Sequence, residues 1–143
     1  MAVVTQEHEA ILVVDDEPAI CSLVKTLLEL EGYAVLIAGD AETATHIYEE
    51  HSAEVALLLT DVKMPGMNGL ELADRILRKK PQLGVLFMSG SPGATGGLAC
   101  IAKPFTRAQL IGRVGMALYR LPPARAQVAA AGIGLQSTSQ RIS

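Results

Sequence analysis

The sequence is poor in aromatic residues and in cysteine. It has no tryptophan, three tyrosines and two phenylalanines. Proteins that bind single-stranded nucleic acid stack the bases on aromatic side chains, so this composition disfavours nucleic acid as the partner. The two cysteines, Cys21 and Cys100, lie far apart and form no CxxC motif. We therefore expect two reduced, buried thiols and no redox or metal site built on them.

Long apolar runs are also missing. Residues 55–59 form one of the longest, with five residues, whereas a helix that crosses a bilayer needs about 18 or more. The first residues show no basic stretch followed by a hydrophobic one, which is the pattern of an export signal. These features predict a cytoplasmic protein that has no contact with the membrane.

No acidic residue follows Asp74. All 15 acidic residues lie in residues 1–74 beside only two lysines, while residues 75–143 contain ten lysines or arginines. In a compact fold this asymmetry produces one acidic and one basic flank, which is the interpretation we favour. Electrostatic docking of a partner protein or nucleic acid on the basic flank is the alternative.

The chain has enough apolar residues for one hydrophobic core. It has 143 residues, of which 50% are hydrophobic and 19% charged, typical of a globular domain. We assign residues 9–121 to this domain. Residues 122–143 are mostly alanine, glycine, serine and glutamine with scattered arginine, a composition too poor in large apolar side chains to pack, so we expect a flexible C-terminal tail.

Short apolar strands alternate with helical patterns along residues 9–121. We expect strands at residues 11–14, 35–38, 55–60, 85–88 and 98–102. Helices are expected to begin at Pro18, after the N-cap Asp40, at Gly69 and after the N-cap Thr106, and Gly32 is expected to end the first of them. This alternation predicts an α/β fold with an open parallel sheet and helices on both faces.

One connection breaks the alternation. Residues 89–97, between the fourth and fifth strands, include four glycines and one proline. A parallel crossover that contains a helix needs at least about 10 to 12 residues, whereas nine extended residues still reach roughly 30 Å. The sequence therefore predicts that the fourth helix is missing or reduced to a loop.

Polar side chains follow four of the five predicted strands. Asp15 and Asp16 follow the first, Asp61 the third, Ser89 the fourth and Lys103 the fifth. In an open α/β sheet, ligands bind beyond the carboxyl ends of the strands. Clustered carboxylates repel one another unless a cation joins them, and oxygen ligands without histidine or cysteine favour Mg²⁺ or Mn²⁺. Each residue alone is more often a helix cap, a turn former or a solvated side chain, but their convergence predicts a metal or phosphoryl site.

Four motifs at these strand ends resemble one family. They are VVDDEP around Asp15 and Asp16, LLTDVKMPGMNGLEL around Asp61, LFMSG ending with Ser89 and Gly90, and AKPF around Lys103. Together they resemble the receiver domain of bacterial two-component response regulators, in particular the single-domain, CheY-like receivers. The resemblance covers roughly residues 9–121 and implies a flavodoxin-like, doubly wound five-stranded parallel sheet of strand order 2-1-3-4-5.

The resemblance also implies a role for each matching residue. Asp61 would be the phosphoacceptor, attacking the phosphorus of a phosphohistidine on a sensor histidine kinase or phosphotransfer protein, or that of a small acyl phosphate. Lys103 and Ser89 would contact phosphoryl oxygens, and the Lys103–Pro104 peptide bond would be cis.

The same resemblance implies a metal site. Asp16 and Asp61 would bind Mg²⁺ directly, with Mn²⁺ as a possible substitute. The backbone carbonyl of Lys63 would be a further ligand, and Asp15 would act through a metal-bound water.

Two departures from the family concern how the domain signals. The fourth helix is missing, and Cys100 stands three residues before Lys103, where the family usually has tyrosine or phenylalanine. We therefore expect activation to order or move the glycine-rich residues 89–97. A homodimer or a docked kinase could cover the apolar surface that the missing helix leaves.

The leading hypothesis is a single-domain response regulator that binds a downstream protein target when phosphorylated. It would catalyse only its own phosphorylation and dephosphorylation and would not otherwise be an enzyme. The alternative is a receiver-like scaffold that binds its partner without phosphorylation, which the missing helix and Cys100 favour and the intact acidic, serine and lysine positions oppose.

Overall fold

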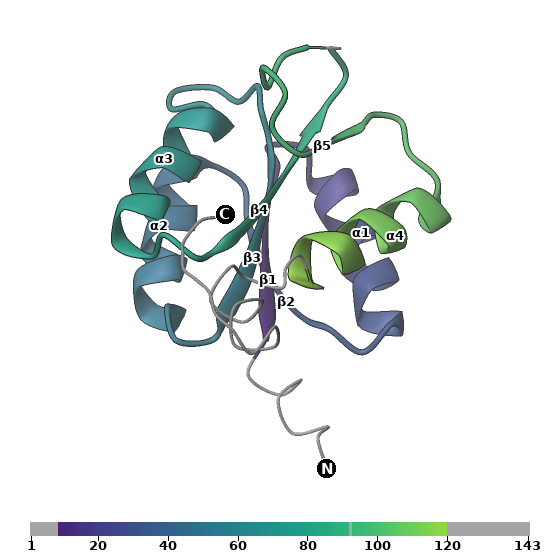
Figure 1. Ribbon diagram of the computed structural model, residues 1–143, viewed down its shortest axis with the longest axis horizontal. Helices are drawn as coiled ribbons and strands as arrows, with labels where there is room; N and C mark the ends of the chain where they lie inside the picture. The colour runs from purple at the N-terminus through teal and green to yellow at the C-terminus, as the bar shows by residue number, and fades with distance from the viewer. Residues whose placement is uncertain (1–8, 92, 120–143) are drawn as a thin grey trace, which may run out of the picture.

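The computed structural model describes residues 9–91 and 93–119. The predicted tail, residues 122–143, lies outside them. A parallel sheet runs through the centre with helices on both faces (Figure 1). In chain order the elements are β1 (Ala10–Val14), α1 (Pro18–Leu30), β2 (Ala34–Ala38), α2 (Ala41–His51), β3 (Val55–Asp61), α3 (Gly69–Lys79), β4 (Gly84–Ser89), β5 (Cys100–Ala102) and α4 (Arg107–Tyr119).

The five strands lie in the order β2-β1-β3-β4-β5, all parallel, which confirms the predicted topology. Val14 pairs with Thr60, and Asp61 pairs with Met88. Because these partners are the last residues of their strands or next to the last, the carboxyl ends of β1, β3 and β4 are level. Residues that end or follow these strands therefore share one rim of the sheet.

The sheet separates two hydrophobic clusters. Leu12 and Val14 of β1 pack into the cluster on the side of α2 and α3, and Ile11 and Val13 into the one on the side of α1 and α4. All four side chains are fully buried. Burial on both faces explains why this strand is a continuous apolar run. Each such side chain contributes about 1.5–3 kcal/mol, so their burial anchors β1 in the core directly before the acids that follow it.

Several predicted helix ends are confirmed. Asp40 accepts a hydrogen bond from the amide of Thr43 at 2.7 Å, and this bond lowers the pKa of its carboxyl group. Gly32 follows α1 with a φ of 95°, and Thr106 accepts a hydrogen bond from the amide of Gln109 at 3.0 Å. One cap was not predicted: Asn68 forms a capping box at the start of α3.

The connection between β4 and β5 contains turns, and its described residues form no helix. This confirms the missing fourth helix, and α4 is the helix that follows β5. The predicted start of the fifth strand at residue 98 was wrong by two residues. Gly96 and Gly97 have φ angles of 60° and 97°, and the amide of Leu98 bonds the carbonyl of Thr95 at 3.2 Å, so the chain is still turning where a strand was expected.

The predicted burial of both cysteines was half right. Both are free thiols. Cys21 is buried beneath β1, whereas Cys100 is partly exposed because it lies on the edge strand next to the uncovered connection.

Ion pairs join the acidic and basic parts of the chain. Lys79 lies 3.0 Å from Glu49, and Arg107 lies 3.2 Å from Glu31. Exposed pairs of this kind contribute about 0–1 kcal/mol each to stability. Their main effect is to reduce the charge difference between residues 1–74 and residues 75–143. No helix within residues 9–91 and 93–119 has the length and apolar character needed to span a membrane.

Gly69 allows α3 to start directly against the backbone of β3. A Cβ atom added at this position would collide with the carbonyl oxygen of Asp61. We therefore expect Gly69→Ala to lower the free energy of unfolding by about 1–3 kcal/mol, as other overpacking substitutions do. Urea denaturation measures this change.

Gly112→Ala is the matched control, because a Cβ atom there meets nothing within 4 Å in the middle of α4. It should leave stability unchanged or raise it by up to about 1 kcal/mol. Equal unfolding midpoints for Gly69→Ala and the parent would contradict the close approach of α3 to Asp61.

Candidate functional site

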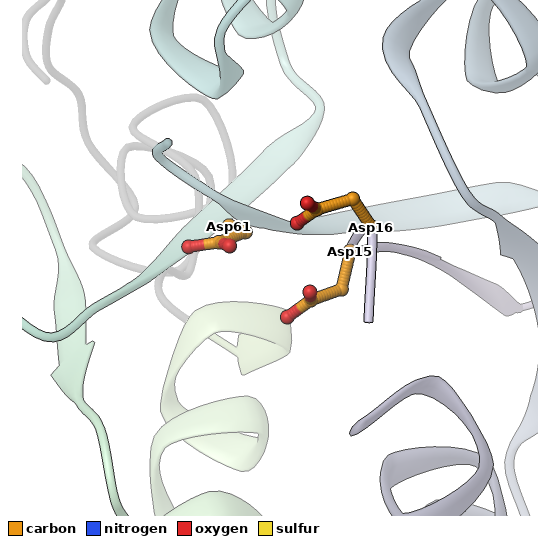
Figure 2. Close-up of side chains that lie close together, drawn as sticks. All are labelled: Asp15, Asp16 and Asp61. Carbon is orange, nitrogen blue, oxygen red and sulfur yellow. The ribbon is translucent and has the colours of Figure 1, made fainter. Parts of the chain in front are cut away.

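Three aspartates meet at the carboxyl ends of β1 and β3. Asp15 and Asp16 follow β1, and Asp61 is the last residue of β3. One carboxylate oxygen from each lies within 4.8 Å of the others. Figure 2 shows the carboxylates of Asp15 and Asp16 extending toward the side on which Asp61 lies. The structure thus brings together all three acids that the sequence predicted to cluster.

Lys103 reaches this cluster from the end of β5. Its Nζ lies 2.9 Å from Oδ2 of Asp15 and 3.3 Å from Oδ2 of Asp61. Its backbone amide donates to the carbonyl of Ser89 at 2.8 Å, and the peptide bond to Pro104 is cis, as predicted. The ammonium group therefore bridges an acid that follows β1 and the acid that ends β3.

The charges of these groups are strongly coupled. Burial raises the pKa of Asp61, the positive charge of Lys103 opposes this rise, and the negative charge of Asp15 adds to it. Burial alone would lower the pKa of Lys103, but its hydrogen bond to Asp15 and the charges of Asp15 and Asp61 outweigh burial and raise it. Lys103 is therefore a stable cation at neutral pH.

The donor set fits a hard divalent cation. Three carboxylates and one ammonium leave two uncompensated negative charges within a few ångströms, and a divalent ion would balance them. All side-chain donors in the cluster are oxygen atoms, the ligand type that Mg²⁺ and Mn²⁺ prefer. The cluster is a candidate divalent metal site.

Short hydrogen bonds hold the acids in place. Asp15 accepts a bond from the amide of Glu17 at 2.9 Å through Oδ1, which leaves Oδ2 for Lys103. The thiol of buried Cys21 donates to the backbone carbonyl of Asp15 at 3.3 Å. Thr60 donates its hydroxyl to the backbone carbonyl of Asp61 at 2.9 Å. These bonds orient the Asp15 carboxylate and fix the backbone of Asp15 and Asp61.

Ser89 lies on the same rim, at the end of β4, but its hydroxyl is engaged elsewhere. It donates to the carbonyl of Ser91 at 3.1 Å and accepts from the amide of Ser91 at 3.0 Å. The side chain of Lys63 also lies near Ser91, with its Nζ 3.5 Å from Oγ of Ser91. The predicted roles of the Ser89 hydroxyl and of the Lys63 carbonyl remain predictions.

Sequence reasoning missed two residues of the site. Oε1 of Glu17 lies 3.8 Å from Nζ of Lys103, and Gly69 packs on the backbone of Asp61. The position of Glu17 directly after the acidic pair was a signal for the first. A glycine immediately after a helix N-cap, where other residues are better helix formers, was a signal for the second.

Two curated proteins similar to this chain are regulators of transcription. The sequence profile of the response regulator receiver domain matches residues 11–115. The chain is 35% identical over 127 residues to the transcriptional regulatory protein AruR of Pseudomonas aeruginosa, covering 81% of this chain and 52% of that protein. It is 33% identical over 118 residues to CpxR of Escherichia coli, covering 77% and 49%. The chain thus spans about half the length of these two relatives.

Solved receiver domains have the same fold. The response regulator TrrA of Thermotoga maritima, in complex with Mg(2+)-BeF, has a TM-score of 0.70 and 32% identity, covering 77% of this chain and 99% of that chain. The receiver domain of the hybrid histidine kinase CckA has a TM-score of 0.69 and 37% identity, covering 76% and 98%. By sequence, by fold and by the acidic cluster at the strand ends, this chain belongs to the response regulator receiver domains of two-component systems.

Proposed function

We propose that Asp61 accepts a phosphoryl group and that phosphorylation changes how the domain binds a downstream protein. The observation that carries this proposal is the position of Lys103, whose ammonium lies 3.3 Å from the Asp61 carboxylate in a cluster of three acids. A carboxylate flanked by a fixed cation and a candidate divalent metal site is suited to receive phosphoryl oxygens, because phosphoryl transfer depends mainly on positioning and charge neutralisation.

The donor would be a phosphohistidine on a sensor histidine kinase or a phosphotransfer protein. A carboxylate oxygen of Asp61 attacks the phosphorus in line, and the bond between phosphorus and the imidazole nitrogen breaks. The nitrogen keeps the electron pair of that bond, and the product is an aspartyl phosphate. Hydrolysis of the aspartyl phosphate by water returns the carboxylate, so the domain would catalyse only its own phosphorylation and dephosphorylation.

Each surrounding residue has its own role in binding the phosphoryl group. Lys103 pairs with one phosphoryl oxygen, and Asp15 keeps the ammonium in place through its 2.9 Å contact. The Ser89 hydroxyl breaks its hydrogen bond to the Ser91 carbonyl and donates to another phosphoryl oxygen. Asp15, Asp16, Asp61 and the backbone carbonyl of Lys63 would hold Mg²⁺, with Mn²⁺ as a substitute, and that ion would neutralise charge on the phosphoryl oxygens.

Residues 9–121 would form the complete receiver in this proposal. A complex of a similar protein with Mg(2+)-BeF supports the choice of metal and of chemistry. The competing hypothesis, a scaffold that needs no phosphorylation, predicts that loss of the acceptor leaves binding to the downstream target unchanged.

Phosphorylation can be tested with acetyl phosphate and Mg²⁺. Intact-mass measurement should show the parent gaining the mass of one phosphoryl group and Asp61→Asn gaining none. Asp40→Asn, which changes an exposed aspartate that caps α2, is the control and should be phosphorylated like the parent. A mass gain in Asp61→Asn, or none in the parent, would refute Asp61 as the acceptor.

Metal binding can be tested by thermal unfolding without any phosphoryl donor. Mg²⁺ at ten times its dissociation constant should stabilise the parent by about 1.4 kcal/mol, and excess chelator should reverse the effect. Asp16→Asn removes one carboxylate of the cluster and should weaken the effect at least severalfold. Glu42→Gln, which changes an exposed acid on α2, should respond like the parent, and an equal response from all three proteins would argue against the site.

The hydrogen bonds between Ser89 and Ser91 predict which residues change when the domain is phosphorylated. If the Ser89 hydroxyl turns to the phosphoryl group, the amide and carbonyl of Ser91 lose their partner. Hydrogen exchange within residues 89–98 should then change when Mg²⁺ and beryllium fluoride are added. Ser89→Ala, which has no hydroxyl to release, should show a smaller change, and identical exchange in the parent with and without the mimic would contradict this loop as the moving part.

A further inference from the structure

The missing helix leaves an apolar groove between α3 and the edge of the sheet. Its volume is about 290 Å³, and it is lined by Leu70 and Leu77 of α3, Val85 and Phe87 of β4, and Leu98 of the helix-free connection. On this face of the sheet α2 and α3 cover the inner strands, while α1 and α4 cover the other face (Figure 1). The strip beside β4 and β5 therefore lacks a covering helix among the described residues.

The groove exposes apolar side chains at the edge of the core. Leu98 is 56% exposed, and Leu70, Leu77 and Val85 are only partly buried although they pack against the core. A contiguous apolar surface of this kind normally meets another element or a partner.

The last described helix ends near the start of β4, on the other side of the sheet edge from this groove. Val85 and Ala99 line both the groove and a second hollow, on the other side of the sheet edge, which Met116 and Ala117 of α4 also line. The carbonyl of Ala117 would lie 3.1 Å from a Cβ atom on Gly84, the first residue of β4. Residues 120–143, a further 24 residues, follow from this point.

The following segment has the length to fill the groove. Leu70 and Leu77 are two helical turns apart, so the groove is about 10 Å long at 1.5 Å per residue. Residues 120–123 can span about 13 Å, and Pro123 suits the first position of a helix. A helix over residues 124–136 would place Val128, Gly132 and Leu135 on one face.

Small side chains and charge also favour this occupant. Residues 124–136 include five alanines, which would allow close approach to a narrow groove. Among the described residues that line the groove, Asp74 is the charged one and it pairs with Arg78 at 3.0 Å; residues 124–136 contain one arginine, Arg125, and no acid that would repel it. Two glycines make the segment a weak helix by itself, so its helical state would depend on docking.

We propose that residues 124–136 form a helix that docks in the groove between α3 and β4 of the same chain, where it takes the place of the helix missing between β4 and β5. This proposal departs from the flexible tail that composition predicts, because composition alone cannot reveal an uncovered groove across the sheet edge from the end of α4. It does not depend on phosphorylation of Asp61.

Hydrogen exchange on the full chain tests the proposal. Amides of residues 124–136 should exchange at least about tenfold more slowly than in an unstructured peptide. Leu98→Asp should abolish this protection and keep the fold, because the side chain is 56% exposed. Leu23→Asp is the matched control: Leu23 is 48% exposed and lies on α1, on the opposite face of the sheet, so protection should persist.

A second pair of variants tests the segment itself. Val128→Asp should remove the protection, whereas Ala130→Asp places the same charge on the opposite side of the expected helix and should retain it. Unprotected amides in the parent, or equal loss in Val128→Asp and Ala130→Asp, would overturn the proposal. Protection that grows with protein concentration would overturn it as well, because the occupant would then be a second copy of the chain.

Discussion

The contact of Lys103 with both Asp15 and Asp61 is the interaction on which the site depends. It joins the ends of β1, β3 and β5 through one ammonium group at 2.9 and 3.3 Å. Without this cation, Asp15 would be a fully buried carboxylate facing a second negative charge, which is among the costliest arrangements in a protein. With it, the cluster keeps two negative charges that a divalent ion can balance, and the Asp61 carboxylate has a cation beside it.

The sheet makes this contact possible. Asp61 can meet Lys103 only because β3, β4 and β5 are adjacent, parallel and in register at their carboxyl ends. The two hydrophobic clusters hold these strands together, because β3 buries Leu58 in one cluster and Leu59 in the other. The packing of the core and the chemistry of the rim are therefore consequences of one arrangement.

The region between β4 and β5 extends from this rim to the apolar groove on the surface. Ser89 begins the helix-free connection and Leu98 comes near its end, so one short segment carries a candidate phosphoryl ligand and part of the groove wall. Four glycines in nine residues allow this segment to change shape with little steric cost.

Much of this protein was determined by the sequence alone. Apolar runs predicted the strands, helical spacing and cap residues such as Asp40 and Thr106 predicted the helices, and a connection of nine residues excluded the fourth helix, because these signals are local. The convergence of Asp15, Asp61 and Lys103 followed from parallel topology. Only the tertiary structure showed that Ser89 turns to Ser91, that Glu17 lies near Lys103, that Cys100 is partly exposed and that β5 starts at Cys100. These features depend on which groups come into contact in the folded chain, and the local pattern of apolar and polar residues does not specify those contacts.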